Sequence, residues 1–153
     1  MADEVSALMQ ALYTDDTAKV DELLAAGPEL DVFEAAALGR VDRLGELLGA
    51  NPELAQAWSP DRARALHFAA FFRQPEATRL LVERGADLND CAFDDYGPTP
   101  LDCAVWGWRN NRTADGDYRG TVEVLVGAGA PTGQAPPTGD PQIDALLSGD
   151  PHL

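Results

Sequence analysis

The sequence predicts an all-α solenoid of about four helix pairs, with an insertion in the last pair and a short helix near the C-terminus. In each of the first three pairs, an apolar residue that opens a helical pattern is followed 15 residues later by a leucine in a second helical pattern, and in the fourth pair the interval is 24 residues. The paired positions are Leu8 and Leu23, Val32 and Leu47, Leu66 and Leu81, and Leu101 and Leu125. Because one helix pair cannot bury its apolar face alone, this repetition predicts a stack of pairs.

A second observation concerns the ends of the second helices. Four positions after each of the later leucines stands a residue that tolerates the left-handed turn with which helices often end. These residues are Gly27, Asn51, Gly85 and Gly129. Residues 23–30 and 47–54 are also nearly identical in sequence, which supports an internal repeat.

The two helices of each pair carry different apolar patterns. The first helix combines a large apolar residue with small residues at helical spacing, which lets neighbouring first helices approach closely. These positions are Ala7, Leu8, Ala11 and Leu12; Val32, Ala35 and Ala36; Leu66, Ala69 and Ala70; and Leu101, Ala104 and Val105. The second helix carries mainly leucines and valines, which fill the layer behind. These positions are Val20, Leu23 and Leu24; Val41, Leu44, Leu47 and Leu48; Ala77, Leu80, Leu81 and Val82; and Val122, Leu125 and Val126.

Two segments depart from the regular spacing. The fourth pair has 9 extra residues (24 minus 15) within 108–120, and they are expected to form a loop that is either functional or a tolerated surface insertion. Residues 132–141 are rich in Gly, Pro and Thr, which is typical of a flexible connector. We therefore expect a repeat domain over 1–131, and over 132–153 the connector and a helix that either caps the stack or forms a loose tail.

The composition is that of an acidic globular protein. Apolar residues make up 45% of the chain and charged residues 24%, and the net charge is −15 with a pI near 4.2. This acidity argues against nucleic acid and anionic membranes as partners, because both attract basic surfaces. Two interpretations stay open, namely solubility and a basic protein partner.

The remaining compositional features predict a cytoplasmic bacterial protein. Residues 1–4 include two acidic residues and do not form a signal-peptide pattern. The apolar stretches of the sequence are too short to cross a bilayer. Cys91 and Cys103 form neither a disulfide framework nor a zinc-binding spacing, which fits a reducing compartment. All basic residues except Lys19 are arginines, and abundant Ala, Gly and Asp accompany them, as is typical of GC-rich bacterial genomes.

Three motifs resemble the ankyrin repeat. They are LHFAA at 66–70, LLVERGADLN at 80–89 and TPLDCA at 99–104. Asp102 replaces the histidine of the family's Thr-Pro-Leu-His helix start, and Arg64 and Ala65 replace its Thr-Pro one repeat earlier. The resemblance covers roughly residues 8–131. It implies an ankyrin-repeat solenoid similar to small bacterial ankyrin proteins, most of which have no assigned activity.

The resemblance also implies a concave face, formed by turn tips and by the exposed side of each first helix. Tyr13, Phe71 and Trp106 occupy equivalent positions on this face. The residues expected to bind a partner are Trp58, Phe71, Phe72, Asp95, Tyr96, Trp106 and Arg109. Aromatic side chains and arginine carry much of the binding energy of interfaces. The alternative is that these rings pack against one another or beneath the insertion.

Few residues offer catalytic or metal-binding chemistry. The resemblance gives His67 a structural role in hydrogen bonds between repeats. Asp94, Asp95 and Asp102 could hold a carboxylate with a raised pKa, but their turn and helix-start positions favour structural roles. Residues 115–117 lack the ligand spacing and the closing glutamate of a calcium loop. We expect no metal, cofactor, phosphate-binding loop or nucleophile elbow.

The leading hypothesis is a non-catalytic module that binds a protein or peptide on its aromatic concave face, and the acidity leaves a basic partner open. One alternative is a small-molecule-binding protein or enzyme with its site in the same groove, near the insertion. Its candidate residues are His67, Asp95, Tyr96, Asp102, Trp106 and Arg109. The other alternative is an acidic inhibitor or immunity-type protein with a basic target. The exposed aromatic residues could also serve a homodimer.

Overall fold

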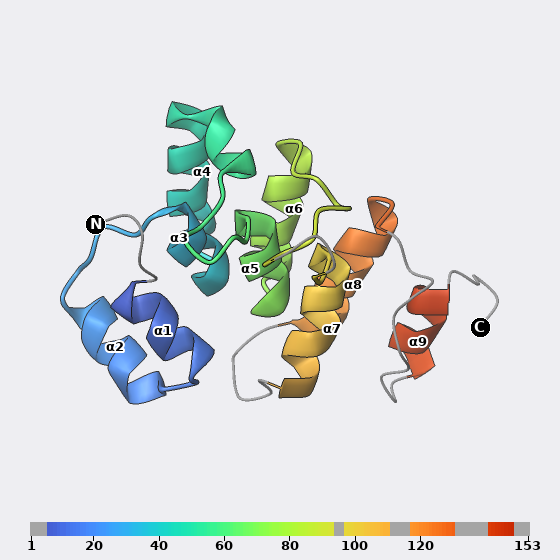
Figure 1. The fold of residues 1–153 in the computed structure, drawn as a ribbon, viewed down its shortest axis with the longest axis horizontal. Helices are drawn as coiled ribbons and strands as arrows, with labels where there is room; N and C mark the ends of the chain where they lie inside the picture. The colour runs from blue at the N-terminus through green and yellow to red at the C-terminus, as the bar shows by residue number, and fades with distance from the viewer. Residues whose placement is uncertain (1–5, 94–96, 111–116, 131–140, 149–153) are drawn as a thin grey trace.

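The computed structural model describes residues 6–93, 97–110, 117–130 and 141–148, and they form an array of helices (Figure 1). The elements are α1 (Ala7–Tyr13), α2 (Thr17–Ala25), α3 (Val32–Leu38), α4 (Val41–Ala50), the 3₁₀ turn η1 (Pro52–Gln56), α5 (Ala65–Phe71), α6 (Pro75–Glu83), α7 (Pro100–Asn110), α8 (Tyr118–Gly127) and α9 (Pro141–Ser148). Four helix pairs precede α9, and no strand occurs among these residues. The predicted all-α solenoid is confirmed.

The pairs stack in two layers. Helices α3, α5 and α7 pack side by side, and α4, α6 and α8 pack side by side behind them (Figure 1). The wholly buried residues include Ala36, Ala69 and Ala104 in the first layer and Leu44, Leu81 and Leu125 in the second. Small side chains let the first helices approach one another, and the leucines fill the space behind them.

The ends of the second helices follow the sequence prediction at three of four positions. Gly27, Gly85 and Gly129 have φ angles of 69°, 87° and 103°, a region that favours glycine. Asn51 has a φ of −145°, so the left-handed turn expected there is wrong. The extended conformation lets the Asn51 side chain accept a hydrogen bond from the Glu53 N–H at 3.2 Å, which begins η1 instead.

The first pair is attached differently from the others. Helix α2 has no buried residue, whereas α1 buries three. The Ser6 hydroxyl donates to the Glu34 carboxylate at 2.8 Å, and the Tyr13 hydroxyl donates to the Asp61 carboxylate at 2.9 Å. The second bond brings the end of α1 to the segment that leads into α5, so an aromatic ring of the first pair lies at the third.

The insertion in the fourth pair and the C-terminal helix are the two irregular parts of the array. The insertion expected as a loop over 108–120 is partly helical, because α7 continues to Asn110 and α8 begins at Tyr118. The first residues of the insertion extend α7 at its C-terminal end, which adds a turn of helix without changing how the helix pairs pack. Residues 111–116 and the connector at 131–140 lie outside the described residues. Helix α9 packs on α8 and buries Leu147 in the core, so it caps the stack.

Candidate partner-binding groove

A groove with a volume of about 740 Å³ opens between α5 and α7. Helix α5 contributes Phe68 and Phe71 to its wall, and α7 contributes Asp102 and Trp106. Tyr13 of α1 and residues of the segments before α5 and before α7 also line it. The groove therefore lies on the side of the array that the first helices and the turns form, which is where the sequence places the aromatic face.

Three aromatic rings form a contiguous row along the groove. The ring centroids of Tyr13 and Phe71 are 6.1 Å apart, and those of Phe71 and Trp106 are 5.2 Å apart. Tyr13 and Phe71 are half-buried, whereas Trp106 is 55% exposed. The three residues come from α1, α5 and α7, so the row joins three helix pairs. The rings of Tyr13, Phe71 and Trp106 therefore lie side by side in the structure.

Phe72 does not lie on the exposed face, and that expectation is wrong. Its side chain is 2% exposed, and its ring packs edge-on against Phe71 at 4.7 Å between centroids. Phe72 follows the last residue of α5, and Arg73 after it has a φ of 58°, so the chain reverses there and directs Phe72 inward. The residue supports the ring of Phe71 rather than offering a surface of its own.

Phe93 is a groove residue that sequence reasoning missed. Its side chain is 51% exposed and lines the groove. Its N–H donates to the Arg62 carbonyl at 2.7 Å, and its φ of 72° is unusual for a bulky residue. Strained backbone of this kind is concentrated at functional sites. The sequence did contain a signal for this residue. Phe93 is an aromatic residue in a predicted turn, and turns offer few buried positions, so an exposed ring was to be expected there.

Trp58 lies on a turn outside the groove lining. Its ring is 42% exposed, and the guanidinium carbon of Arg64 stacks over it at 4.1 Å from the centroid. Arg64 is held in turn by an ion pair of its Nε with the Asp90 carboxylate at 2.6 Å. Trp58 is thus an exposed, orientated side chain on a turn and does not line the groove.

The other predicted partner-binding positions cannot be placed at the groove. Asp95 and Tyr96 lie outside the described residues. Arg109 belongs to α7, but its side chain is outside the described part of the structure. These three residues stay predictions from the sequence.

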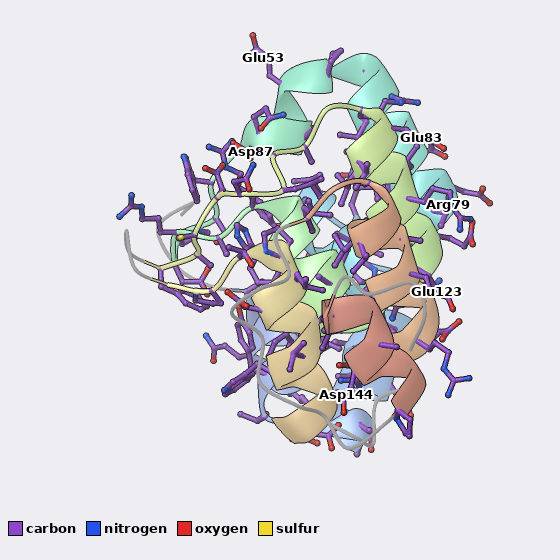
Figure 2. The ribbon with its side chains drawn as sticks, turned by 90° about the vertical axis from the view of Figure 1, so that its right-hand side faces the viewer. Glu53, Arg79, Glu83, Asp87, Glu123 and Asp144 are labelled. Atoms are coloured by element: carbon purple, nitrogen blue, oxygen red, sulfur yellow. The ribbon has the colours of Figure 1, made fainter. Side chains whose placement is uncertain are left out.

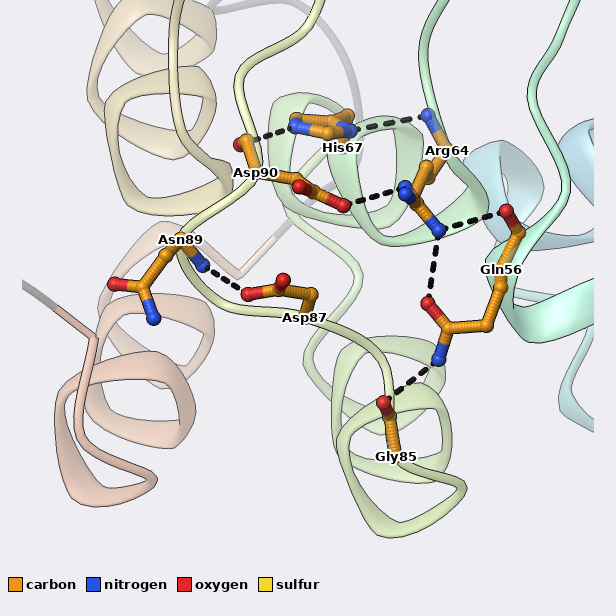
Figure 3. A network of polar contacts seen from close by, with 7 residues as sticks. All are labelled: Gln56, Arg64, His67, Gly85, Asp87, Asn89 and Asp90. Carbon is orange, nitrogen blue, oxygen red and sulfur yellow. Dashed lines mark hydrogen bonds and ion pairs between the residues drawn. The ribbon is translucent and has the colours of Figure 1, made fainter.

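His67 fastens the start of α5 to the turn that follows the next helix (Figure 3). Its Nδ1 accepts a hydrogen bond from the Arg64 N–H at 3.0 Å, and its Nε2 donates to the Asp90 carbonyl at 2.9 Å. Because Nδ1 is an acceptor here, the ring is neutral with its proton on Nε2. Burial, the largest cause, lowers the pKa of His67 and favours this neutral form. The structural role expected for His67 is confirmed.

Asp102 occupies the equivalent position at the start of α7. Its Oδ2 accepts a hydrogen bond from the Thr99 N–H at 3.1 Å, and its own N–H donates to the Thr99 hydroxyl at 3.3 Å. This reciprocal pair is a capping box, which satisfies two backbone donors at the helix start. The helix-start role expected for Asp102 is confirmed, and its side chain also lines the groove.

The comparison with known families agrees with this geometry. A model of the family described as "Ankyrin repeats (3 copies)" matches residues 32–130. The chain belongs to the ankyrin-repeat family. The matched part runs from α3 through α8, so the ankyrin model does not cover the first helix pair. Ankyrin repeats generally serve as protein-interaction modules.

A curated relative shares part of the ankyrin array. A rice protein (Oryza sativa subsp. japonica) described as "E3 ubiquitin-protein ligase XB3" is 41% identical over 76 residues. These residues make up 49% of this chain and 16% of the rice protein. The chain therefore spans a small fraction of that relative, and the name of the rice protein describes the rice protein alone.

The reactive side chains of the ankyrin groove are held in their neutral forms. Burial raises the pKa of the Tyr13 hydroxyl, and the neighbouring Asp61 carboxylate raises it further. Burial also raises the pKa of the Cys103 thiol, which lines the groove. Neither group is activated as a nucleophile, because a nucleophile needs a lowered pKa or an adjacent base. Among the described residues, no group of three or more His, Cys, Asp and Glu side chains is placed to hold a metal.

The outer face of the ankyrin array differs from the groove. The second helices and the turns after them carry acidic side chains that point into solvent, with the basic Arg79 among them (Figure 2). The acidic residues include Glu53, Glu83, Asp87 and Glu123. Within the described part of the chain, no helix has both the length and the apolar character needed to cross a membrane. The exposed aromatic surface is thus confined to the groove and the turns beside it, as far as the structure describes the chain.

Proposed function

We propose that this ankyrin array is a non-catalytic interaction module that binds a protein segment in the groove between α5 and α7. One observation carries the proposal. Among the described residues, the exposed large hydrophobic side chains are Trp58, Phe93 and Trp106, and the last two line the groove. Exposed aromatic side chains gathered in a concave surface are typical of partner sites.

The groove is also organised before any partner arrives. The ring of Phe71 contacts three others: Tyr13 and Phe72 meet it edge-on, and Trp106 lies against it at a tilt of 31°. The Tyr13 hydroxyl is anchored by its bond to Asp61. Aromatic side chains in fixed positions lose little conformational entropy on binding, which favours affinity.

A small-molecule ligand is the second candidate for the same groove. The observation that favours it is the volume of about 740 Å³, because small-molecule sites measure roughly 300–1,000 Å³. The neutral Tyr13 and Cys103 side chains support binding without covalent chemistry. The protein-binding proposal is preferred, because the exposed aromatic side chains also include Trp58, which lies outside the groove lining.

Site-specific photo-cross-linking tests the proposal. A benzoylphenylalanine is placed at Phe93, in the groove lining, and in a matched control at Arg79, which is exposed on the outer face of α6. In cells that naturally contain the protein, we expect a polypeptide adduct from position 93 that is absent from position 79. The adduct should weaken when Trp106→Ala is added.

The outcomes separate the hypotheses. An adduct from position 79 but not from 93 would favour an acidic inhibitor that meets its target with the outer face. Irradiation that yields no polypeptide adduct at position 93 would reject a protein partner in the groove. Melting curves of both variants serve as the control for folding, since both substituted side chains are exposed.

A further inference from the structure

We infer that the segment bound in the groove presents a basic side chain, Lys or Arg, next to the apolar side chain that covers the aromatic row. The inference rests on the proposed function and deepens it, because it specifies the chemistry of the partner. Three observations support it: the charge of the groove wall, the position of Asp102 relative to Trp106, and the shape of the aromatic floor.

As far as the structure describes it, the wall of the groove is mainly apolar and carries the Asp102 carboxylate. Among the described residues that line it there is no lysine or arginine. His67 also lines it, and both of its ring nitrogens are engaged with backbone groups. A carboxylate beside apolar rings disfavours an anionic ligand and leaves a cationic one as the complementary choice. The net charge of −15 acts in the same direction at longer range.

Asp102 and Trp106 lie on the same face of α7. They are four residues apart in a helix that runs from Pro100 to Asn110, and both line the groove. A cation that approaches the Asp102 carboxylate therefore lies one helical turn from the exposed indole ring. Aromatic faces attract cations within about 6 Å of the ring centroid. The carboxylate and the ring together form a site for an ammonium or guanidinium group.

The carboxylate has capacity for such a ligand. The described bond to Asp102 is the one from the Thr99 N–H to Oδ2 at 3.1 Å. An ionised carboxylate offers about four acceptor positions on its two oxygens. The family's motif has histidine at this position, as His67 shows in the preceding repeat, and a neutral ring offers no such charge. The replacement therefore keeps the backbone bond and adds a negative group to the groove.

The shape of the floor favours a peptide segment over an isolated organic cation. The ring row crosses three helix pairs, with centroid separations of 6.1 Å and 5.2 Å from Tyr13 through Phe71 to Trp106. A peptide can cover this row with one or two apolar side chains while a neighbouring basic side chain reaches Asp102. A lone cation would use the end of the row at Trp106 and leave the rest exposed.

A peptide selection tests the inference. A library of short random peptides is selected on the full chain, and peptides that also bind the Trp106→Ala variant are discarded, so that the retained peptides bind in the groove. We expect the retained peptides to share an apolar residue beside Lys or Arg. Replacing that basic residue by glutamine should weaken binding to the wild type by about three- to tenfold.

The same peptides are then measured on two isosteric variants. Asp102→Asn keeps an oxygen that can accept the Thr99 N–H and removes the charge; on this variant we expect the Lys- or Arg-to-glutamine replacement to have almost no effect. Asp42→Asn makes the same change in net charge at an exposed position on α4, and we expect it to behave as the wild type. Added salt should weaken the wild-type complex more than the Asp102→Asn complex.

Each outcome bears on one of the two proposals. Retained peptides that lack basic residues, or whose basic residue matters equally on the wild type and on Asp102→Asn, would overturn this inference and leave the proposed function intact. A selection in which no peptide distinguishes the wild type from Trp106→Ala would overturn the proposed function, and this inference with it.

Discussion

The first helices of the third and fourth repeats begin with equivalent four-residue segments, 64–67 and 99–102, whose last residues differ in charge and in contacts. In α5 this residue is His67, which accepts the Arg64 N–H and donates to the Asp90 carbonyl. In α7 it is Asp102, which accepts the Thr99 N–H. Both side chains therefore cap a helix, but the histidine also ties the helix to the following turn, whereas the aspartate brings charge to the groove.

The difference teaches that one framework position can be used in two ways. The backbone requires only an acceptor three residues after the N-cap, and an imidazole nitrogen or a carboxylate oxygen satisfies it. The remaining properties of the side chain are then available for another role. In the third repeat that role is internal and structural, and in the fourth we propose that it is recognition.

The largest expected effect tests whether the two repeats share one core. Leu81 in α6 and Leu125 in α8 are equivalent and wholly buried. Each change to alanine should lower the free energy of unfolding by about 2–5 kcal/mol, because it removes buried methyl groups and leaves a cavity. Urea unfolding measures this loss, with the half-buried Leu80→Ala as the milder control. A melting temperature within a degree of the wild type for either variant would contradict a shared core.

The second expected effect separates the two helix starts. His67→Ala removes two hydrogen bonds of a buried side chain and should lower the free energy of unfolding by about 1–3 kcal/mol. Asp102→Ala removes one bond of a half-buried side chain and should cost about 0.5–1.5 kcal/mol. The same unfolding assay measures both. If Asp102→Ala proved the more damaging of the two, the assignment of the structural role to His67 would not stand.

The smallest expected effect is a pH dependence specific to the third repeat. Burial lowers the pKa of His67 in the folded state below its ordinary 6.5, so the unfolded state binds the proton more tightly. The stabilisation by neutral His67 is present above pH 6.5 and is lost as the pH falls from there through the folded pKa. The loss is smaller than for His67→Ala, because the protonated ring still donates to Asp90.

The measurement compares the wild type with His67→Gln across this pH range. The free energy of unfolding of the wild type should decrease more steeply on acidification than that of the variant. Parallel curves would show that His67 does not titrate differently in the folded and unfolded states. Asp102→Asn serves as a matched control in the fourth repeat and should leave the His67-dependent slope in place.

Much of the framework was predictable from local patterns. The recurring spacing identified the helix pairs, because a buried face must repeat at the period of the helix. The alanines of α5 and the leucines of α6 fall in the core as expected. Asn51 shows the limit of such patterns: a residue that tolerates a left-handed turn also forms extended caps, and Asn51 caps η1.

The face that carries the groove could be predicted from the sequence, but not all of the residues that line it. Tyr13, Phe71 and Trp106 share a face because their repeats are in register. Phe72 was misplaced because adjacent residues at a helix end point in different directions, and which one faces inward depends on where the helix stops. Phe93 was missed because no periodicity extends through a turn.

The sequence by itself determined the repeat, the apolar stripes, the acidity and the identity of the residue at each helix start, since these are properties of local spacing and composition. Only the tertiary structure decided that Tyr13 reaches Asp61 and the third repeat, that Phe72 lies beneath Phe71, and that Asp102 lines a groove with Trp106. The physical reason is that Tyr13 and Asp61 are far apart in the chain, and that the surroundings of Phe72 and Asp102 are built from helices of other repeats. These contacts follow from how the helix pairs stack and where each helix ends, which local periodicity does not specify.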